Sequence, residues 1–251
     1  MATKSVKEAS SEVDFVVTMV PVGSNVKEIF LENGILTAAS PGTVMIDSST
    51  IDVQSAQTVH EAAKSAGFNM IDAPVSGGVI GADAGTLTFM CGGDKESFEK
   101  AKPILQGMGK NIVHCGSGGL GQATKICNNM LAGINALAAA EAMTMGERLG
   151  VSPEVLYEVI ATSTGRSYIF ETSNPMPNVC STSPANNEFK PGFMAKLMLK
   201  DLRLSQAAAQ DARTSTPLGA AATAAFQQLI DSGFVDLDTS SIIKMIRPES
   251  K

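Results

Sequence analysis

The stretch VMIDSSTIDVQSAQTVHEAAKSAGFNMID, residues 44–72, decides the fold class of this chain. It begins with a short apolar run at 44–46, continues with helical spacing over 53–66 that Gly67 ends, and returns to an apolar run at 70–71. A strand, a helix and a second strand in this order form the repeating unit of parallel sheets. Because both apolar runs are continuous rather than alternating, we expect strands that are buried on both faces.

The same pattern continues on both sides of this stretch. Before it lies the apolar run VDFVVTMV at 13–20, which Pro21 closes. After it come two further predicted strands, at 86–91 and 112–115, with a helical pattern over 95–108 between them. Residues 1–116 are therefore predicted to form an α/β domain with a Rossmann-like parallel sheet.

The second half of the chain has a helical pattern almost throughout. Residues 121–149, rich in Ala, Met and Leu, predict a helix longer than most in globular proteins. Ser152 and Pro153 then begin a new helix as its cap and first residue. A loop rich in Pro, Asn and Ser is expected at 174–193. Further helices are expected at 197–210, 217–231 and 239–246. We therefore expect residues 117–251 to form an all-helical domain.

Composition excludes several classes of protein. The 251 residues carry a net charge of −6 without any basic run, which argues against nucleic-acid binding. The longest apolar stretch, 131–140, is too short to span a membrane. The four cysteines and two histidines lie far apart, so no metal site is expected. The first 14 residues lack the apolar segment of a targeting peptide.

Two residues of the long predicted helix are candidates for chemistry. Lys125 and Asn129 are four residues apart, so their side chains project from one face. Near the helix N-terminus, the macrodipole and partial burial are expected to lower the pKa of Lys125, so that it can accept and return a proton. Asn129 can hold a substrate oxygen. A solvated lysine on an amphipathic helix is the alternative explanation.

Other candidates follow the predicted strands. Consecutive N–H groups at Ser76, Gly77 and Gly78 can bind a carboxylate or phosphate, although a flexible turn has the same composition. The segment 47–50 is also typical of a helix N-cap, and a strand ending at Pro21 needs no ligand. Lys200 and Asp201 form a charge pair that on most helices is merely solvated.

Together these segments resemble the 3-hydroxyisobutyrate dehydrogenases of the β-hydroxyacid dehydrogenase family. The resemblance extends from about residue 13 to 247. The motifs that carry it, in order, are MVP at 19–21, IDSST at 46–50, DAPVSGGVIGADAGTLTFMCGG at 72–93, GLGQATKICNNM at 119–130 and LKDLRL at 199–204. The family reaction it implies is the NAD-dependent oxidation of 3-hydroxyisobutyrate to methylmalonate semialdehyde in valine breakdown.

The resemblance implies a role for each candidate. Lys125 matches the catalytic lysine. Asn129 matches the asparagine that positions substrate, and Ser76, Gly77 and Gly78 match the loop that binds the substrate carboxylate. The residues that match NAD contacts are Val20, Pro21, Asn25, Thr50 and Lys200. Family members assemble as homo-oligomers, many in mitochondria, and the resemblance implies the same here; a form without a targeting peptide would be cytoplasmic.

The family also begins with a strand, a GxGxxG turn and a helix, and no such unit precedes residue 13. We therefore expect an N-terminally shortened member that binds NAD weakly, because the glycine turn supplies the pyrophosphate site. Two alternatives remain open. One is a dehydrogenase for another small β-hydroxyacid, with tartronate or succinic semialdehyde as the partner compound. The other is a catalytically silent oligomeric relative.

Overall fold

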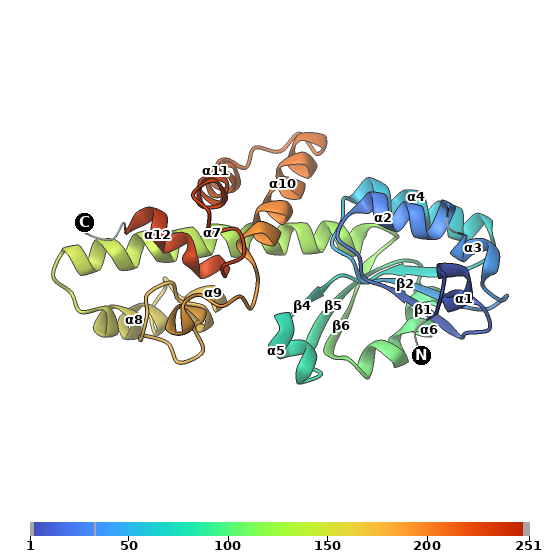
Figure 1. Ribbon diagram of the computed structural model, residues 1–251, viewed down its shortest axis with the longest axis horizontal. Coiled ribbons are helices and arrows are strands. Elements are labelled where there is room, and N and C mark those ends of the chain that lie inside the picture. The colour runs from blue at the N-terminus through green and yellow to red at the C-terminus, as the bar shows by residue number, and fades with distance from the viewer. Residues whose placement is uncertain (1–2, 33, 248–251) are drawn as a thin grey trace. The chain divides into compact units, whose positions relative to one another are not determined.

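The computed structural model describes residues 3–32 and 34–247 (Figure 1). The chain forms two compact units, Met1–Ile126 and Cys127–Lys251. The first contains the sheet and the second is helical, so the expected order of an α/β part and a helical part is confirmed.

The first unit is built on a six-stranded sheet in the order β1-β2-β3-β5-β4, with β6 paired to β5. The strands are β1 (Phe15–Thr18), β2 (Val44–Asp47), β3 (Asn69–Asp72), β4 (Val75–Ser76), β5 (Leu87–Gly92) and β6 (Gly109–Gly116). Strands β1, β2 and β3 are parallel, as expected, but β5 runs antiparallel to β3. The sheet is mixed because the chain returns from β3 through the short strand β4 rather than through a long crossover helix.

Helices cover both faces of this sheet (Figure 1). One core contains Met45 and Met70 from the strands, under α2 (Gly23–Lys27), the π-helical turn Glu28–Glu32 and α4 (Val53–Ser65). The other core contains Ile46 and Ile71, which are neighbours of those methionines in sequence, packed with α6 (Lys95–Gln106). Successive side chains thus enter opposite cores, which explains the continuous apolar runs. The short helices of this unit are α1 (Val6–Ser10), α3 (Ile35–Ala38) and α5 (Gly78–Asp83).

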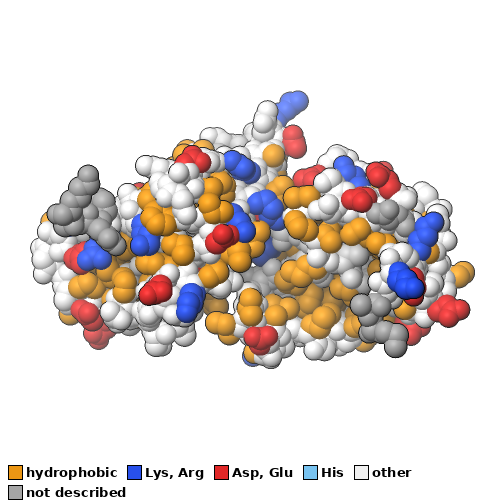
Figure 2. Space-filling view, viewed as in Figure 1, with side chains coloured by type: hydrophobic (Ala, Val, Ile, Leu, Met, Phe, Trp, Pro, Cys, Tyr) orange, Lys and Arg blue, Asp and Glu red, His pale blue; other side chains and the backbone are white. Residues whose placement is uncertain are grey.

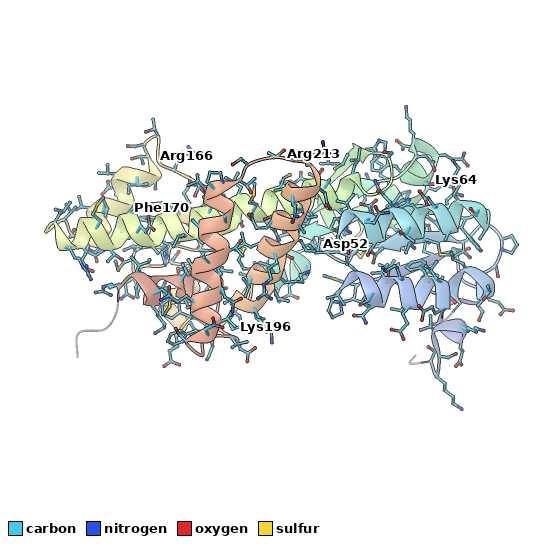
Figure 3. All side chains as sticks on the ribbon, turned by 90° about the horizontal axis from the view of Figure 1, so that it is seen from above. Asp52, Lys64, Arg166, Phe170, Lys196 and Arg213 are labelled. Carbon is cyan, nitrogen blue, oxygen red and sulfur yellow. The ribbon has the colours of Figure 1, made fainter. Side chains whose placement is uncertain are left out.

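The ends of α4 follow the sequence closely. The Asp52 side chain accepts a hydrogen bond of 2.7 Å from the Ser55 N–H and so caps the helix N-terminus. Lys64 lies in the last turn, where a positive charge complements the helix dipole. Figure 3 shows Asp52 and Lys64 at opposite ends of the helix.

Helix α7 (Leu120–Arg148) runs from the first unit into the second. The second unit also contains α8 (Pro153–Ala161), α9 (Tyr168–Thr172), a 3-10 turn at Pro184–Asn187, α10 (Ala195–Asp211), α11 (Pro217–Asp231), a 3-10 turn at Thr239–Ile242 and α12 (Ile243–Ile246). Its core includes Met143, Phe170, Leu202 and Phe226; Figure 3 labels Phe170. In the described part of the chain, no helix combines the length and the apolar character needed to cross a bilayer.

Two details of the second unit concern close packing. A Cβ atom on Gly133 of α7 would lie 2.9 Å from Leu202 Cδ2 of α10, so glycine allows these helices to approach. The expected loop at 174–193 is held by Asn174, which is fully buried. Its side chain donates to the Phe170 carbonyl at 3.1 Å and accepts from the Met176 N–H at 3.0 Å.

Strand β1 lies at the edge of the sheet, beside an open groove of about 320 Å³. The groove is lined mainly by apolar side chains of α1, β1 and the segments that follow. Val17 and Met19 are 46% and 70% exposed there. Figure 2 shows that apolar side chains gather over the sheet on this face.

Candidate active site

The carboxyl ends of the first three strands carry a buried polar network. Thr18, Asp47 and Asp72 lie side by side in register. Asp47 Oδ1 accepts hydrogen bonds from Thr18 Oγ1 at 2.8 Å and from Ser49 Oγ at 2.6 Å. Ser49 Oγ in turn accepts from the Val20 N–H at 2.9 Å. The network thereby ties the segment after β1 to the segment after β2.

Burial raises the pKa of the Asp47 carboxyl, because the surrounding protein solvates its charge poorly. The hydrogen bonds from Ser49 and Thr18 act in the opposite direction, and nearby Asp72 adds to the increase. Asp47 thus serves mainly as the acceptor that holds the two segments together.

Asp72, fully buried, anchors the start of α7. Its Oδ1 accepts from the Gly119 N–H at 2.7 Å and lies 2.8 Å from His60 Nε2, while its Oδ2 accepts from the Gln122 N–H at 2.8 Å. A carboxylate at a helix N-terminus satisfies free N–H groups and complements the dipole. The first turn of α7 is therefore fixed to the end of β3.

The glycines around this contact are required by space. A Cβ on Gly121 would lie 2.7 Å from Asp72 Oδ2, and one on Gly92 would lie 2.4 Å from Asp72 Oδ1. Residues 116–121, GSGGLG, match the spacing GxGxxG between β6 and α7, which the sequence reading had not singled out. Here N–H groups at the turn donate to the Asp72 carboxylate, so the turn serves to pack the start of α7 against the end of β3.

The structure places Lys125 and Asn129 on α7, as predicted, and buries both, at 7% and 4% exposed. Gln122, Lys125 and Asn129 follow at intervals of three and four residues, so they share one face of the helix. A lysine this deeply buried is unusual unless it is paired. Burial thus argues against the simple solvated lysine, and the catalytic role stays a prediction.

Asn129 and Lys200 are connected within the second unit through Asp201. The Asn129 Nδ2 donates to Asp201 Oδ2 at 2.5 Å, and Lys200 Nζ lies 3.1 Å from Asp201 Oδ1. Asp201 is only 2% exposed, so the reading of Lys200 and Asp201 as a merely solvated pair is wrong. The Asp201 carboxylate thereby fixes the orientation of the Asn129 amide. The Oδ1 of Asn129 is the remaining acceptor, and it accepts from Asn128 Nδ2 at 2.9 Å.

Ser76 ends β4, Gly77 lies between β4 and α5, and Gly78 begins α5. Gly77 and Gly78 have φ values of 137° and 62°, a region that favours glycine. Both glycines are exposed and Ser76 is half-buried, so their backbone is open to a ligand. The role of these residues as a carboxylate-binding loop stays a prediction.

The predicted NAD contacts of the first unit lie after neighbouring strands. Val20 and Pro21 follow β1, and Thr50 follows β2; Asn25 lies in α2, the helix that comes next after β1. The buried hydroxyl of Ser48, beside them in sequence, has no hydrogen-bond partner among the described residues. Apolar Val20 and Pro21, a threonine hydroxyl and a spare hydroxyl suit a flat ring with an amide, so these residues fit the nicotinamide end of NAD.

Sequence reasoning did not predict the contacts by which three residues, Gln122, Asp72 and Asp201, hold the site. All three act through hydrogen bonds to residues 47 to 73 positions away. Local patterns carry no signal for such contacts. Among the described residues, no cluster of His, Cys, Asp and Glu could hold a metal ion.

This α/β unit, continued by a helical unit through a helix with a buried lysine, defines an NAD-dependent dehydrogenase of the 3-hydroxyacid class. Residues 1–116 match the family model of the NAD-binding domain of 6-phosphogluconate dehydrogenase. Residues 119–246 match the model of the NAD-binding domain of NADP-dependent 3-hydroxyisobutyrate dehydrogenase. The chain belongs to the 3-hydroxyisobutyrate dehydrogenase family.

Relatives with names of this class agree with this assignment. The chain is 42% identical over 248 residues to the NAD-dependent L-serine dehydrogenase of Pseudomonas aeruginosa, covering 98% of this chain and 83% of that protein. It is 44% identical over 237 residues to the 3-hydroxyisobutyrate dehydrogenase of the same organism, covering 93% and 80%. A solved structure of Mycobacterium tuberculosis 3-hydroxyisobutyrate dehydrogenase with L-serine has a TM-score of 0.92 at 44% identity, covering 98% of this chain and 83% of that one.

Proposed function

We propose that this chain oxidises the primary alcohol of 3-hydroxyisobutyrate to the aldehyde, with NAD as the oxidant. The observation that carries the proposal is the burial of Lys125 on the anchored end of α7, one helical turn before the buried Asn129. The residues of the chain then have three tasks, which are proton transfer, orientation of the substrate and binding of the cofactor.

Lys125 performs the proton transfer. In the neutral form of Lys125, Nζ accepts the proton of the substrate hydroxyl while a C–H bond breaks at the carbon that bears this hydroxyl. In the reverse direction its ammonium donates that proton to the carbonyl oxygen. Because α7 is held at its N-terminus by Asp72, the lysine keeps a fixed position during both steps.

Ser76, Gly77 and Gly78 bind the substrate carboxylate through their backbone N–H groups, and Asn129 orients the substrate hydroxyl end. Val20, Pro21, Asn25 and Thr50 contact the nicotinamide end of NAD, and Lys200 contributes a positive charge on the cofactor side. When bound, NAD accepts the hydride that leaves the alcohol carbon. The protein moves only the proton.

L-Serine is the second candidate substrate, because one relative is named for it and a solved relative was studied with it. Serine and 3-hydroxyisobutyrate share a carboxylate and a hydroxymethyl group. Serine carries an ammonium group where 3-hydroxyisobutyrate carries a methyl group. The same proton transfer serves both compounds. Comparing kcat/KM for the two, with glycerate and 4-hydroxybutyrate as further compounds, decides between them.

The test of the reaction is the isosteric variant Lys125→Met, with reduction of NAD followed at 340 nm. Loss of general base catalysis typically lowers kcat by about 10²- to 10⁴-fold. The exposed Lys110 provides the control, because Lys110→Met should leave kcat unchanged. A Lys125→Met enzyme with kcat near that of the wild type would refute the proposal, provided that circular dichroism shows the same fold.

The biological setting follows from the same proposal. A role in valine breakdown and a homo-oligomeric state are expected, as the resemblance implies. The relative from Mus musculus is named as mitochondrial, and mitochondrial location is the corresponding expectation here. Fractionation of cells that express the natural gene tests the location.

A further inference from the structure

We propose that Gln122 is a positioning residue that fixes the backbone of Thr50 against the first turn of α7, and thereby sets the NAD-contacting segment relative to Lys125. The inference rests on the proposed function for the roles of Thr50 and Lys125. The contacts of Gln122 themselves belong entirely to the first unit.

The amide of Gln122 makes two hydrogen bonds that flank Thr50. Its Nε2 donates to the Ser49 carbonyl at 2.7 Å, and its Oε1 accepts from the Ile51 N–H at 3.0 Å. One residue of a parallel neighbouring strand makes the same pair of bonds. The side chain therefore substitutes for a strand at the point where β2 has ended, and it holds Thr50 from one side.

Burial makes these bonds costly to lose. Gln122 is fully buried, and Ser49 and Ile51 are each 1% exposed. If the amide is removed, a buried carbonyl and a buried N–H lose their partner and water does not easily replace it. The native position of Thr50 thus depends on this side chain.

The backbone from which the Gln122 side chain projects is held in place as well. The Gln122 N–H donates to Asp72 Oδ2, so the end of β3 holds its backbone. Lys125 lies three residues further on the same helical face, and it is also buried. A single rigid turn therefore links Asp72, the Thr50 segment and Lys125.

Both ends of the Gln122 amide are engaged by backbone groups, so it acts through Thr50 and not as a catalytic residue. A purely structural role is the competing explanation. Asn174 provides the matched control because it makes the same kind of backbone clamp in the second unit, also at 0% exposure.

The experiment compares Gln122→Met and Asn174→Leu with the wild type. NMR titration with NAD follows the amides of Thr50 and Ile51 and measures dissociation constants into the millimolar range. Hydrogen exchange of the same amides reports the clamp without any cofactor or turnover. Steady-state kinetics supplies KM for NAD and kcat separately.

For Gln122→Met we expect exchange of the Ile51 amide to accelerate about tenfold or more. The dissociation constant and KM for NAD should rise at least about tenfold, which corresponds to about 1.4 kcal/mol. Asn174→Leu should lose thermal stability but leave both values unchanged. Unchanged NAD affinity in Gln122→Met, or equal loss of affinity in both variants, would overturn the proposal.

Gln122→Glu is a second variant that keeps the proposal testable if Gln122→Met does not fold. When protonated, the glutamic acid can again donate to the Ser49 carbonyl, so NAD affinity should recover from pH 8 to pH 5. The absence of such recovery contradicts the proposal. If instead Lys125→Met keeps full activity, the proposed function fails, while the exchange and binding results for Gln122 still stand.

Discussion

At the residue scale, two buried aspartates at the ends of neighbouring strands do different work. Asp47 accepts from Thr18 and Ser49 and joins the segments after β1 and β2. Asp72 accepts from the first turn of α7 and contacts His60. Neither carboxylate transfers a proton in the proposed reaction: Asp47 holds the segments after β1 and β2, and Asp72 holds the start of the helix that carries Lys125.

Asp47→Asn should make the protein less sensitive to pH. The pKa of Asp47 is raised in the folded state, so folding takes up a proton between the unfolded pKa, about 3.9, and the higher folded value. This contribution to stability is present at low pH and is lost as pH rises through the folded pKa. The free energy of unfolding of wild type minus that of Asp47→Asn should therefore be larger at pH 4 than at pH 7.

Urea unfolding at the two pH values measures this difference. The slope for one proton is at most about 1.4 kcal/mol per pH unit. Because Asn keeps the Oδ1 acceptor, the variant is expected to fold. A difference that does not depend on pH would show that Asp47 is no more protonated in the folded than in the unfolded chain.

At the scale of elements, α7 owes its position to an anion that the protein supplies itself. In Asp72→Ala, the N–H groups of Gly119 and Gln122 lose a buried acceptor, which should cost about 3 kcal/mol or more of unfolding free energy. The vacated space is shaped for a carboxylate. Formate at tens of millimolar should therefore restore part of the melting temperature.

The control for this prediction is Asp94→Ala. Asp94 caps α6 through the Ser97 N–H but is exposed, so its loss should cost only about 1 kcal/mol. Formate should have no selective effect on that variant. Equal responses of both variants to formate would indicate a general salt effect and refute the anion site.

The elements that the sequence predicted well are those with long periodic patterns or clear caps. Helices α4, α6, α7 and α11 begin and end within about two residues of the expected positions. The helices that were missed, α1, α2, α3, α5 and α9, have four to six residues, which is too short for periodicity to be recognised. The direction of β5 was also not predictable, because an apolar run is the same in either direction.

In the candidate site too, local features could be predicted from the sequence and long-range contacts could not. The common helical face of Lys125 and Asn129 follows from their spacing of four, which the sequence shows directly. The clamp by Gln122 and the link from Asn129 to Asp201 join residues 71 to 73 positions apart. Such contacts exist only once the tertiary fold brings the partners together.

At the scale of the whole molecule, surface apolar side chains on the second unit suggest association. Met145 in α7 is 63% exposed, and Leu149, directly after α7, is 75% exposed. Val155 and Val159 in α8 are 53% and 54% exposed. We expect light scattering at micromolar concentration to give at least twice the mass of 26.0 kDa. Val159→Glu should shift the mass toward that of a monomer, and a strict monomer in the wild type would contradict the expectation.

The clamp by Gln122 also constrains how the chain folds while it is being synthesised. Ser49 and Gln122 are 73 residues apart, which a ribosome needs about 4–15 s to translate. During that interval the Ser49 carbonyl and the Ile51 N–H have emerged, but the amide that pairs with them has not. The end of β2 therefore stays hydrated on the nascent chain until the start of α7 has left the exit tunnel.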